Sequence, residues 1–266
     1  KDLCALYLAN LAKYSALKPL KKLAVAPVYV NGKLIYSPGY YEKEETLYVG
    51  EKITPKYTFD KLKQVASYFP TKTDTDQTNI LATFISPCFN QSFIGARPFY
   101  LLRGDASNLG KTSLAHICAI LHKNKEARDF TFPSTDDELE KALFAALLKS
   151  DFITIDNASN SGRTIRSGCL ERVLTSSNPS FRILGKSESI EIENIFSLFL
   201  TLNTGKFSMD LITRALPVFL TFENKCVMPS DFEPKEYAHQ HRNELLSEIV
   251  GLILLWKRKG CPTVPV

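Results

Sequence analysis

The sequence predicts an α/β fold with a parallel sheet of five strands that is flanked by helices. Apolar runs of strand length alternate with helical patterns between residues 98 and 156, an order that is typical of parallel sheets. A glycine-bearing segment, GDASNLGKTS, follows one of these strands and opens a helix. The 266 residues are 44% hydrophobic, 11% aromatic and 23% charged, which excludes a disordered, collagen-like or coiled-coil chain. We expect one large domain with extensions, or two unequal domains.

Residues 1–57 are expected to form a small α+β extension. A helical pattern over residues 3–17 precedes the strand-like runs AVAPVYV, KLIYS and TLYVG, which the turn signals Asn31-Gly32 and Pro38-Gly39 separate. Residues 58–96 are expected to form a helical lead-in, because apolar residues recur at helical spacing over 58–68 and 76–85.

Residues 97–225 carry the expected sheet. Its strands are PFYLLR, DFTF, FITID, IFSLFLTLN and ALPVFLTF, and its helices cover residues 111–122, 136–148 and 165–174. The runs FRIL and SIEIEN are joined by a turn-like segment at 185–188 and predict a hairpin. Residues 226–266 form the closing segment, in which one amphipathic helix over 237–257 ends before Gly260 and Pro262.

Charge and cysteine usage set only loose limits on partners and location. The net charge of +5, with basic and acidic residues interleaved, permits a nucleic-acid partner without demanding one. The six cysteines form no Cys-x-x-Cys pair and no zinc-like cluster, so we expect a reduced, cytoplasmic location. No apolar run approaches the roughly 18 residues of a membrane span, so no membrane partner is expected. The chain starts at Lys1 without Met or a secretory signal, and we expect it to be a fragment of a longer protein.

The glycine-bearing segment has the context of a phosphate-binding loop, between a strand and a helix. Main-chain N–H groups there and the helix N-terminus can bind phosphate oxygens. Five residues separate the two glycines in place of the usual four, so Asp105 stands where the first glycine is usual. The alternative is an accidental Gly-Lys-Thr in a surface loop. The residues expected to bind the nucleotide are Gly104, Ser107, Asn108, Leu109, Gly110, Lys111, Thr112 and Ser113.

Two of these residues and one distant carboxylate predict the use of ATP and Mg²⁺. The Lys111 ammonium can reach the β and γ phosphates, and the Thr112 hydroxyl can bind the metal. Asp156 ends the apolar run FITID, which brings its oxygens to the sheet edge where phosphates bind. The alternative for Asp156 is a polar residue that merely ends a strand. The next residue is Asn157, and not the Glu that polarises water in many ATPases, so the catalytic base stays open.

Together with two further residues, this site resembles that of the AAA+ ATPases, in the manner of superfamily 3 helicases. Asn203, at the end of IFSLFLTLN, and Arg214, eleven residues later, look like the sensor asparagine and the arginine finger of that family. The chain is similar to the motor part of phage, plasmid or integrated-element primase-helicases, in which an Asp-Asn pair can also occur at the strand end. The stretches that carry the resemblance are VNGKLIYSPGYYEKEETLYV, SYFPTKTDTDQTNILATFISP, DELEKALFAALLKSDFITIDN, FRILGKSE and LTLNTGKFSMDLITRALPVFL.

The resemblance implies roles for the remaining polar residues. Asn203 would orient the lytic water near the γ phosphate, and Arg214 would act on a neighbouring subunit's ATP. The alternative for Arg214 is an ion pair with Asp210, one turn away. In superfamily 3 motors a hairpin grips a nucleic-acid strand, and Lys186 at the tip with Arg182 at the base would contact DNA phosphates here. The alternative is an ordinary solvated turn.

The sequence therefore predicts an ATP-driven DNA helicase or translocase of a mobile element. The resemblance implies a ring, expected to be a hexamer, and allows a primase domain upstream. One alternative is an AAA+ loader or remodeller that assembles replication proteins on DNA without unwinding it. Another is a nucleotide-dependent regulatory module with little turnover, which Asn157 and the unusual glycine spacing motivate.

Overall fold

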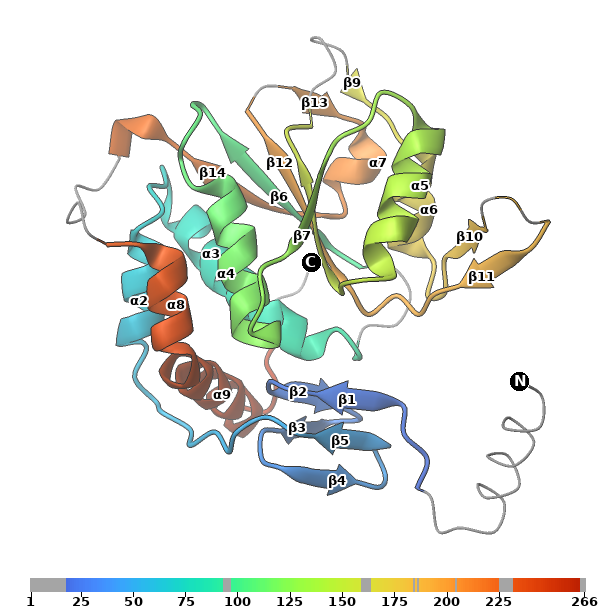
Figure 1. The fold of residues 1–266 in the computed structure, drawn as a ribbon. Coiled ribbons are helices and arrows are strands. Elements are labelled where there is room, and N and C mark those ends of the chain that lie inside the picture. Colours follow the sequence, from blue (N-terminus) through green and yellow to red (C-terminus); the bar gives the residue numbers. More distant parts are fainter. Residues whose placement is uncertain are drawn as a thin grey trace, which may run out of the picture.

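The computed structural model describes residues 18–92, 97–158, 164–183, 185, 187–203, 205–224 and 232–263. The helix expected over residues 3–17 lies outside these residues. The amino-terminal part forms two small sheets below the main body (Figure 1). One has the order β1-β5-β4, with β1 (Lys22–Ala24), β4 (Gly39–Tyr41) and β5 (Thr46–Tyr48), and the other pairs β2 (Val28–Val30) with β3 (Lys33–Ile35). The run AVAPVYV is therefore two strands that are broken at Pro27, because proline cannot donate to a ladder.

Two helices and a 3-10 turn follow as the lead-in. They are α2 (Asp60–Ser67), α3 (Asp74–Ile85) and η1 (Ser86–Phe89). Helix α3 lies along the edge strand of the main sheet and satisfies two of its free main-chain groups. Asp76 accepts a hydrogen bond from the Phe219 nitrogen at 2.9 Å, and the Asn79 amide donates to the Pro217 carbonyl at 2.7 Å.

The main sheet has five strands, and all of them are parallel. They are β6 (Phe99–Gly104), β7 (Arg128–Thr131), β8 (Phe152–Asp156), β12 (Ser197–Leu202) and β14 (Ala215–Leu220), in the order β14-β6-β12-β8-β7. The predicted α/β class with a five-stranded parallel sheet is confirmed. The three inner strands, β6, β12 and β8, are nearly continuous apolar runs because both of their faces are covered, whereas the edge strand β7 is polar and mostly exposed.

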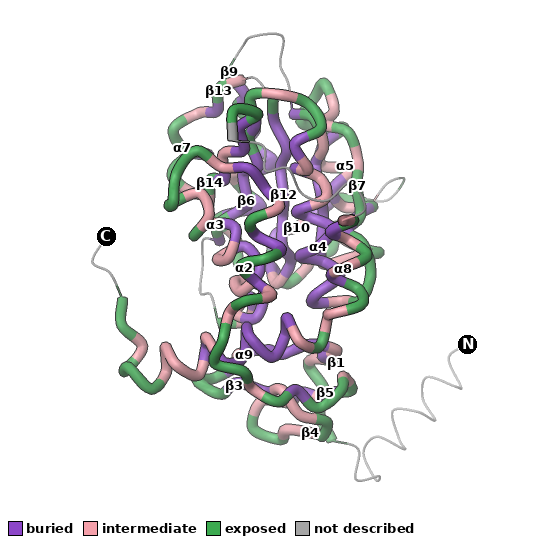
Figure 2. The backbone as a smooth tube through the Cα atoms, turned by 90° about the vertical axis from the view of Figure 1, so that its left-hand side faces the viewer, coloured by how far each residue is buried: buried purple, intermediate pink, exposed green. Residues whose placement is uncertain are grey.

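Helices on both faces of the sheet bury two separate cores (Figure 1). Tyr100 and Leu102 of β6 point to the core that α4 (Lys111–Lys123), α3 and the carboxyl-terminal helices cover. Phe99 and Leu101, on the opposite face, point to the core under α5 (Asp136–Leu147) and α6 (Gly168–Thr175). Figure 2 shows the buried residues concentrated along β6, β12 and α4, with β4 at the exposed outer side.

The helix predicted over residues 165–174 begins later than expected. Ile165 belongs to a short strand, β9 (Thr164–Ile165), which pairs in parallel with β13 (Lys206–Phe207). Helix α6 then starts at Gly168, because the Ser167 hydroxyl caps it by accepting from the Leu170 nitrogen at 3.1 Å. A four-residue helix, α7 (Met209–Ile212), follows β13.

The prediction of one carboxyl-terminal helix was wrong, because His241 divides it. Helices α8 (Pro234–Gln240) and α9 (Arg242–Arg258) meet at this residue, whose ψ of 17° is not helical. Its Nδ1 atom lies 3.0 Å from Lys61 Nζ and 2.8 Å from Glu244 Oε1. At the junction of the two helices, the His241 ring thus contacts both a lysine and a carboxylate.

The predicted hairpin is confirmed and projects from the side of the main body (Figure 1). Strands β10 (Ser180–Arg182) and β11 (Ser189–Glu191) are antiparallel, and a 3-10 turn, η2 (Phe222–Asn224), follows β14. One buried core includes residues of the amino-terminal sheets, the lead-in, the sheet and α9. Within the described residues, no helix is long and apolar enough to cross a membrane.

Candidate functional site

The carboxyl ends of the three inner strands meet at one edge of the sheet. The strand registers place Gly104 beside Leu220, and Leu202 beside Arg103. Asp156, the last residue of β8, ends at the same edge. Since ligands of open parallel sheets bind at this edge, the sequence-predicted residues of the loop, Asp156 and Asn203 all lie at the expected end.

Residues 105–110 form the loop between β6 and α4. Asn108 and Gly110 have positive φ values of 59° and 84°, which turn the chain so that the N-terminus of α4 faces the sheet edge. A Cβ atom at Gly110 would lie 3.0 Å from Phe69 Cε1, so this glycine is required by the chain itself. Leu109 is buried in the core, so only its main chain can take part in binding. Ser107 and Asn108 are exposed.

Lys111 begins α4 and folds back over the loop. Its side chain is buried, and Nζ donates to the Ala106 carbonyl at 2.9 Å. Burial lowers the pKa of the Lys111 ammonium, and the carboxylates of Asp156 and Asp105 oppose that shift. A partly desolvated ammonium with one neutral partner is well suited to bind an anion such as phosphate.

Asp156 is held by two hydroxyl groups, one from strand β12 and one from helix α4. Its Oδ1 atom accepts from Thr201 Oγ1 at 2.6 Å and from Thr112 Oγ1 at 3.1 Å. Thr201 also accepts from the Asn157 nitrogen at 2.9 Å. The sequence analysis missed Thr201, although a polar residue within the apolar run of β12 was a signal for it.

The oxygen donors at this edge fit a magnesium ion that is shared with phosphates. Thr112 and Asp156 offer hard oxygen ligands side by side, and Mg²⁺ usually takes only one or two protein carboxylates, with water and phosphate oxygens as the rest. In the described ranges, no group of three or more His, Cys, Asp and Glu side chains could hold a metal by itself. Any cation here would therefore depend on a bound phosphate ligand.

Asp105 explains the extra residue in the loop. Its carboxylate accepts from Thr221 Oγ1 at 2.6 Å and from the Phe222 nitrogen at 2.9 Å, at the end of β14. The bond from Thr221 and the bond from Phe222 lower the pKa of Asp105. Asp105 therefore ties the loop to the neighbouring strand, a role that spacing alone did not reveal.

Asn157 and Asn203 are both exposed at the sheet edge. Asn157 follows β8 with a φ of 53°, a left-handed conformation that Asn tolerates better than Glu. The backbone therefore gives a physical reason for Asn at this position. Asn203 follows β12, which lies between β6 and β8, so it lies between the loop and Asp156.

Arg214 lies at the opposite edge of the sheet. It precedes β14, whose first residue pairs with Phe99 at the start of β6, roughly 17 Å of strand away from the loop. Its Nη1 atom donates to the Asp210 main-chain carbonyl. No ion pair of Arg214 with the Asp210 carboxylate occurs among the described residues, and Arg214 Nε is buried there without a hydrogen-bond partner. Arg214 therefore cannot reach the site of its own chain.

The hairpin is anchored firmly at its base. Phe181 is buried and stacks on Phe144 with ring centroids 5.4 Å apart, and Arg172 donates to the Ser180 carbonyl at 2.7 Å. Arg182 is exposed and lines a cavity of about 360 Å³ that also contains side chains of α5. Lys186, the expected DNA contact at the tip, lies outside the described residues.

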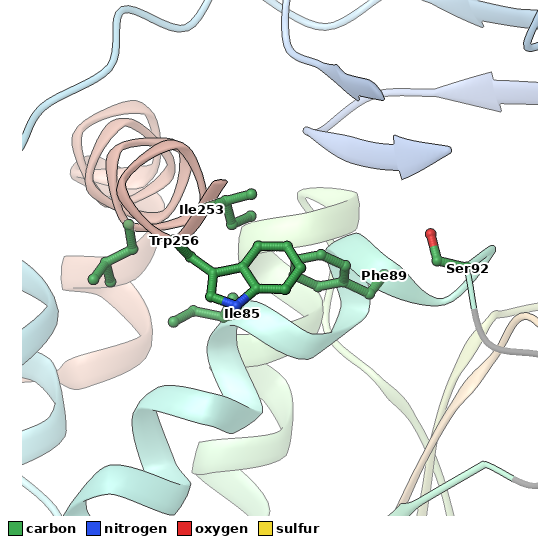
Figure 3. Close-up of a pocket in the computed structure, with 6 residues that line it drawn as sticks. Ile85, Phe89, Ser92, Ile253 and Trp256 are labelled. Carbon is green, nitrogen blue, oxygen red and sulfur yellow. The ribbon is translucent and has the colours of Figure 1, made fainter. Parts of the chain in front are cut away.

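A second, apolar cavity of about 460 Å³ belongs to another part of the molecule. Figure 3 shows Trp256 and Ile253 of α9 directed towards Ile85 and Phe89. The Trp256 ring contacts the rings of Tyr29 and Phe89, with centroids 6.3 and 5.8 Å away. These contacts are packing contacts, and none of the phosphate-loop residues lines this cavity.

Comparison with known proteins gives similarity in structure only. No family model and no curated protein sequence matches the chain. The apo structure of the NrS-1 C-terminal region matches with a TM-score of 0.52 and 10% identity, and the match covers 93% of this chain and 59% of that one. A JCV helicase with a bound acetamide compound matches with a TM-score of 0.42, 15% identity and coverage of 74% and 53%. The helicase Cch of SCCmec type IV matches with a TM-score of 0.40, 14% identity and coverage of 97% and 51%.

At 10% identity, the similarity to the NrS-1 region concerns the fold. It agrees with the parallel-sheet architecture described above, and the two lower TM-scores add nothing to it. The chain spans about three fifths of the NrS-1 region, as the 59% coverage states.

Proposed function

We propose that this chain is the ATPase motor of a DNA helicase or translocase that serves the replication of a mobile element of phage or plasmid type. The observation that carries the proposal is the hydrogen bond between Thr112 and Asp156, 3.1 Å long. It joins the second residue of α4 to the last residue of β8. In the sheet, β12 lies between β8 and β6, the strand that precedes α4. A hydroxyl and a carboxylate in this position, beside the Lys111 ammonium, can bind the magnesium ion of a nucleoside triphosphate.

Lys111 would exchange its bond to the Ala106 carbonyl for the β and γ phosphates of ATP, assisted by main-chain N–H groups of residues 108–113. Thr112 and Asp156 would hold Mg²⁺, which neutralises charge on the transferred phosphoryl group when bound. Thr201 keeps the Asp156 carboxylate oriented for this task. Asn203 would place the lytic water, since its amide both donates and accepts hydrogen bonds. Asn157 offers a second amide, and neither residue can take up the proton of the water at neutral pH.

Arg214 would complete the site of a neighbouring subunit. Its place at the far edge of the sheet supports this role, because the same chain's loop is out of reach. An arginine supplied in trans stabilises charge on the phosphoryl group and contributes about 10³ to 10⁵ in rate. Head-to-tail contacts of this kind close into rings, and we propose a hexamer.

The hairpin would contact DNA through Lys186 and Arg182. It projects from the main body on a firm base (Figure 1), and one Lys186 per subunit would give a ring of positive charge. Contacts to phosphates provide affinity without sequence preference. A primase domain upstream, which rests on the resemblance, and a cytoplasmic location, which rests on the cysteine usage, complete the proposal.

The test is ATP turnover with and without single-stranded DNA, for the wild type and Lys186→Ala. A motor should be stimulated by DNA, and Lys186→Ala should lose the stimulation and keep the basal rate. A wild type that hydrolyses ATP without any response to DNA would favour a loader or remodeller. A wild type that binds ATP with almost no turnover would favour a regulatory module.

A further inference from the structure

Two aromatic rings lie beside the last residue of the phosphate loop. Tyr68 and Phe69 follow α2, and a Cβ atom at Gly110 would lie 3.0 Å from Phe69 Cε1 and 3.9 Å from Tyr68 Cε1. The two rings are in edge contact, with centroids 5.3 Å apart. Phe69 is fully buried, whereas Tyr68 is partly exposed. Phe69 therefore supports the loop from inside, and Tyr68 stays partly accessible to solvent.

A third ring comes from a distant part of the sequence. Phe232, just before α8, lies with its centroid 5.5 Å from that of Tyr68, and the planes are tilted by 40°. Phe232 is also partly exposed. Its ring also contacts the ring of Tyr237 in α8, with centroids 5.2 Å apart. Tyr68 and Phe232 thus form a partly open aromatic pair next to the N-terminus of α4, here called the aromatic pair.

The phosphate loop follows β6, which has β12 on one side and β14 on the other. Asp156 lies on the β12 and β8 side of β6, and Thr112 bonds to it there. Residues 70 and 71, which follow Tyr68 and Phe69, lie on the other side, at β14. The Thr221 nitrogen donates to the Pro70 carbonyl at 2.9 Å, and Thr71 forms an isolated β-bridge with Leu220. A triphosphate whose γ end meets Asp156 would therefore direct its other end towards Tyr68.

We propose that the aromatic pair binds the base of the nucleotide by stacking, and that it selects a purine because the larger ring system covers both side chains. This inference rests on the proposed ATP site, since it assumes phosphates at the N-terminus of α4. Aromatic side chains stack on the π-face of a base, and a purine offers the larger face. The pair would provide affinity for the base that Lys111 and the loop cannot provide.

The experiment measures binding of ATP, CTP and inorganic tripolyphosphate by titration calorimetry with Mg²⁺. The variants are Tyr68→Leu and Phe232→Leu, which keep an apolar side chain but remove the ring. Phe89→Leu is the matched control, because Phe89 also packs against two rings but lines the separate apolar cavity. Thermal unfolding of each variant reports whether the fold is kept.

The wild type should bind ATP more tightly than CTP and tripolyphosphate. Tyr68→Leu and Phe232→Leu should each weaken ATP binding by about 10-fold and leave tripolyphosphate binding unchanged, and Phe89→Leu should change neither. Equal affinity of the wild type for ATP and tripolyphosphate would overturn the aromatic pair and leave the phosphate site standing. An equal loss for both ligands in the variants would also overturn it. A wild type that binds neither ligand would refute the nucleotide site itself.

Discussion

The Thr201 hydroxyl holds Asp156 from the neighbouring strand, 2.6 Å from Oδ1. Because the same oxygen accepts from the Asn157 nitrogen at 2.9 Å, its hydrogen is directed to the carboxylate. Thr201 is 2% exposed, so water does not compete for this bond. The orientation of Asp156 towards Thr112 therefore depends on a residue that would touch neither the nucleotide nor the metal.

Thr201→Val should slow ATP turnover by about 10- to 100-fold, as for other residues that orient a metal ligand. It should also raise the Mg²⁺ concentration needed for half-maximal turnover, which a merely structural role would not do. Thr201→Ser should restore both. Thr154→Val is the matched control, since the buried Thr154 hydroxyl of β8 has no hydrogen-bond partner in the described part of the chain. Normal turnover in Thr201→Val would contradict the role given to Thr201.

Glu248 should stabilise the fold by capping a helix that is distant in sequence. It is 2% exposed on α9, and its carboxylate accepts from the nitrogens of Lys61 and Leu62 at 3.2 and 2.9 Å, in the first turn of α2. Glu248→Leu leaves both donors unpaired and should lower the free energy of unfolding by about 1 to 3 kcal/mol. Urea unfolding measures this change.

The control for Glu248 is Glu244→Leu, one turn earlier on α9. Glu244 pairs with Lys56, Lys61 and His241 at the surface, where ion pairs contribute little. A loss of stability in Glu244→Leu as large as in Glu248→Leu would speak against the capping account.

His122 should make the fold sensitive to mild acid. Burial lowers its pKa to about 4, with further contributions from Arg242, Lys123 and Lys22, and Nε2 donates to the Phe84 carbonyl at 2.8 Å. The unfolded chain takes up this proton near pH 6.5. The free energy of unfolding is therefore highest above about pH 6.5 and decreases as the pH falls towards 4, because only the unfolded chain binds the proton in this range. The decrease is about 2 to 3 kcal/mol at pH 4.5.

His122→Gln keeps a donor for the Phe84 carbonyl and removes the titrating group. Urea unfolding at pH 7 and pH 4.5 should show a smaller difference between the two pH values for this variant than for the wild type. An equal difference for both proteins would mean that His122 does not titrate below its ordinary range.

Arg214 should act across a subunit interface. Arg214→Ala should lose about 10³-fold or more in ATP turnover and still bind ATP, because its own site lacks nothing. Mixing Arg214→Ala with Lys111→Ala should restore turnover, at most to about a quarter of the wild-type rate, since a working interface needs both residues intact. No recovery on mixing would contradict a role in trans.

The sheet could be predicted from the sequence because its inner strands are buried on both faces. Runs such as FITID and IFSLFLTLN are nearly continuous and apolar, so local signals and tertiary structure agree. The edge position of Asp156 followed from the same reasoning. The hairpin β10–β11 was also predictable, because turn residues stand between two alternating runs.

Other features depend on contacts that no local pattern reveals. Strands β9 and β13 have two residues each and exist only because they pair with one another. Where the last helix is divided, His241 contacts Lys61, which is 180 residues away. Asp105 has the appearance of a defect in a glycine motif, and its bonds to Thr221 and Phe222 become visible only when β14 lies beside β6.

The most direct test of the account is steady-state ATP hydrolysis by the wild type and Lys111→Ala, over a range of protein concentrations and with single-stranded DNA. If the loop, Thr112 and Asp156 form an ATPase site that Arg214 of another subunit completes, the wild-type rate per chain should rise with protein concentration. The Lys111→Ala rate should stay at background throughout. A wild-type turnover no faster than that of Lys111→Ala would contradict the central claim.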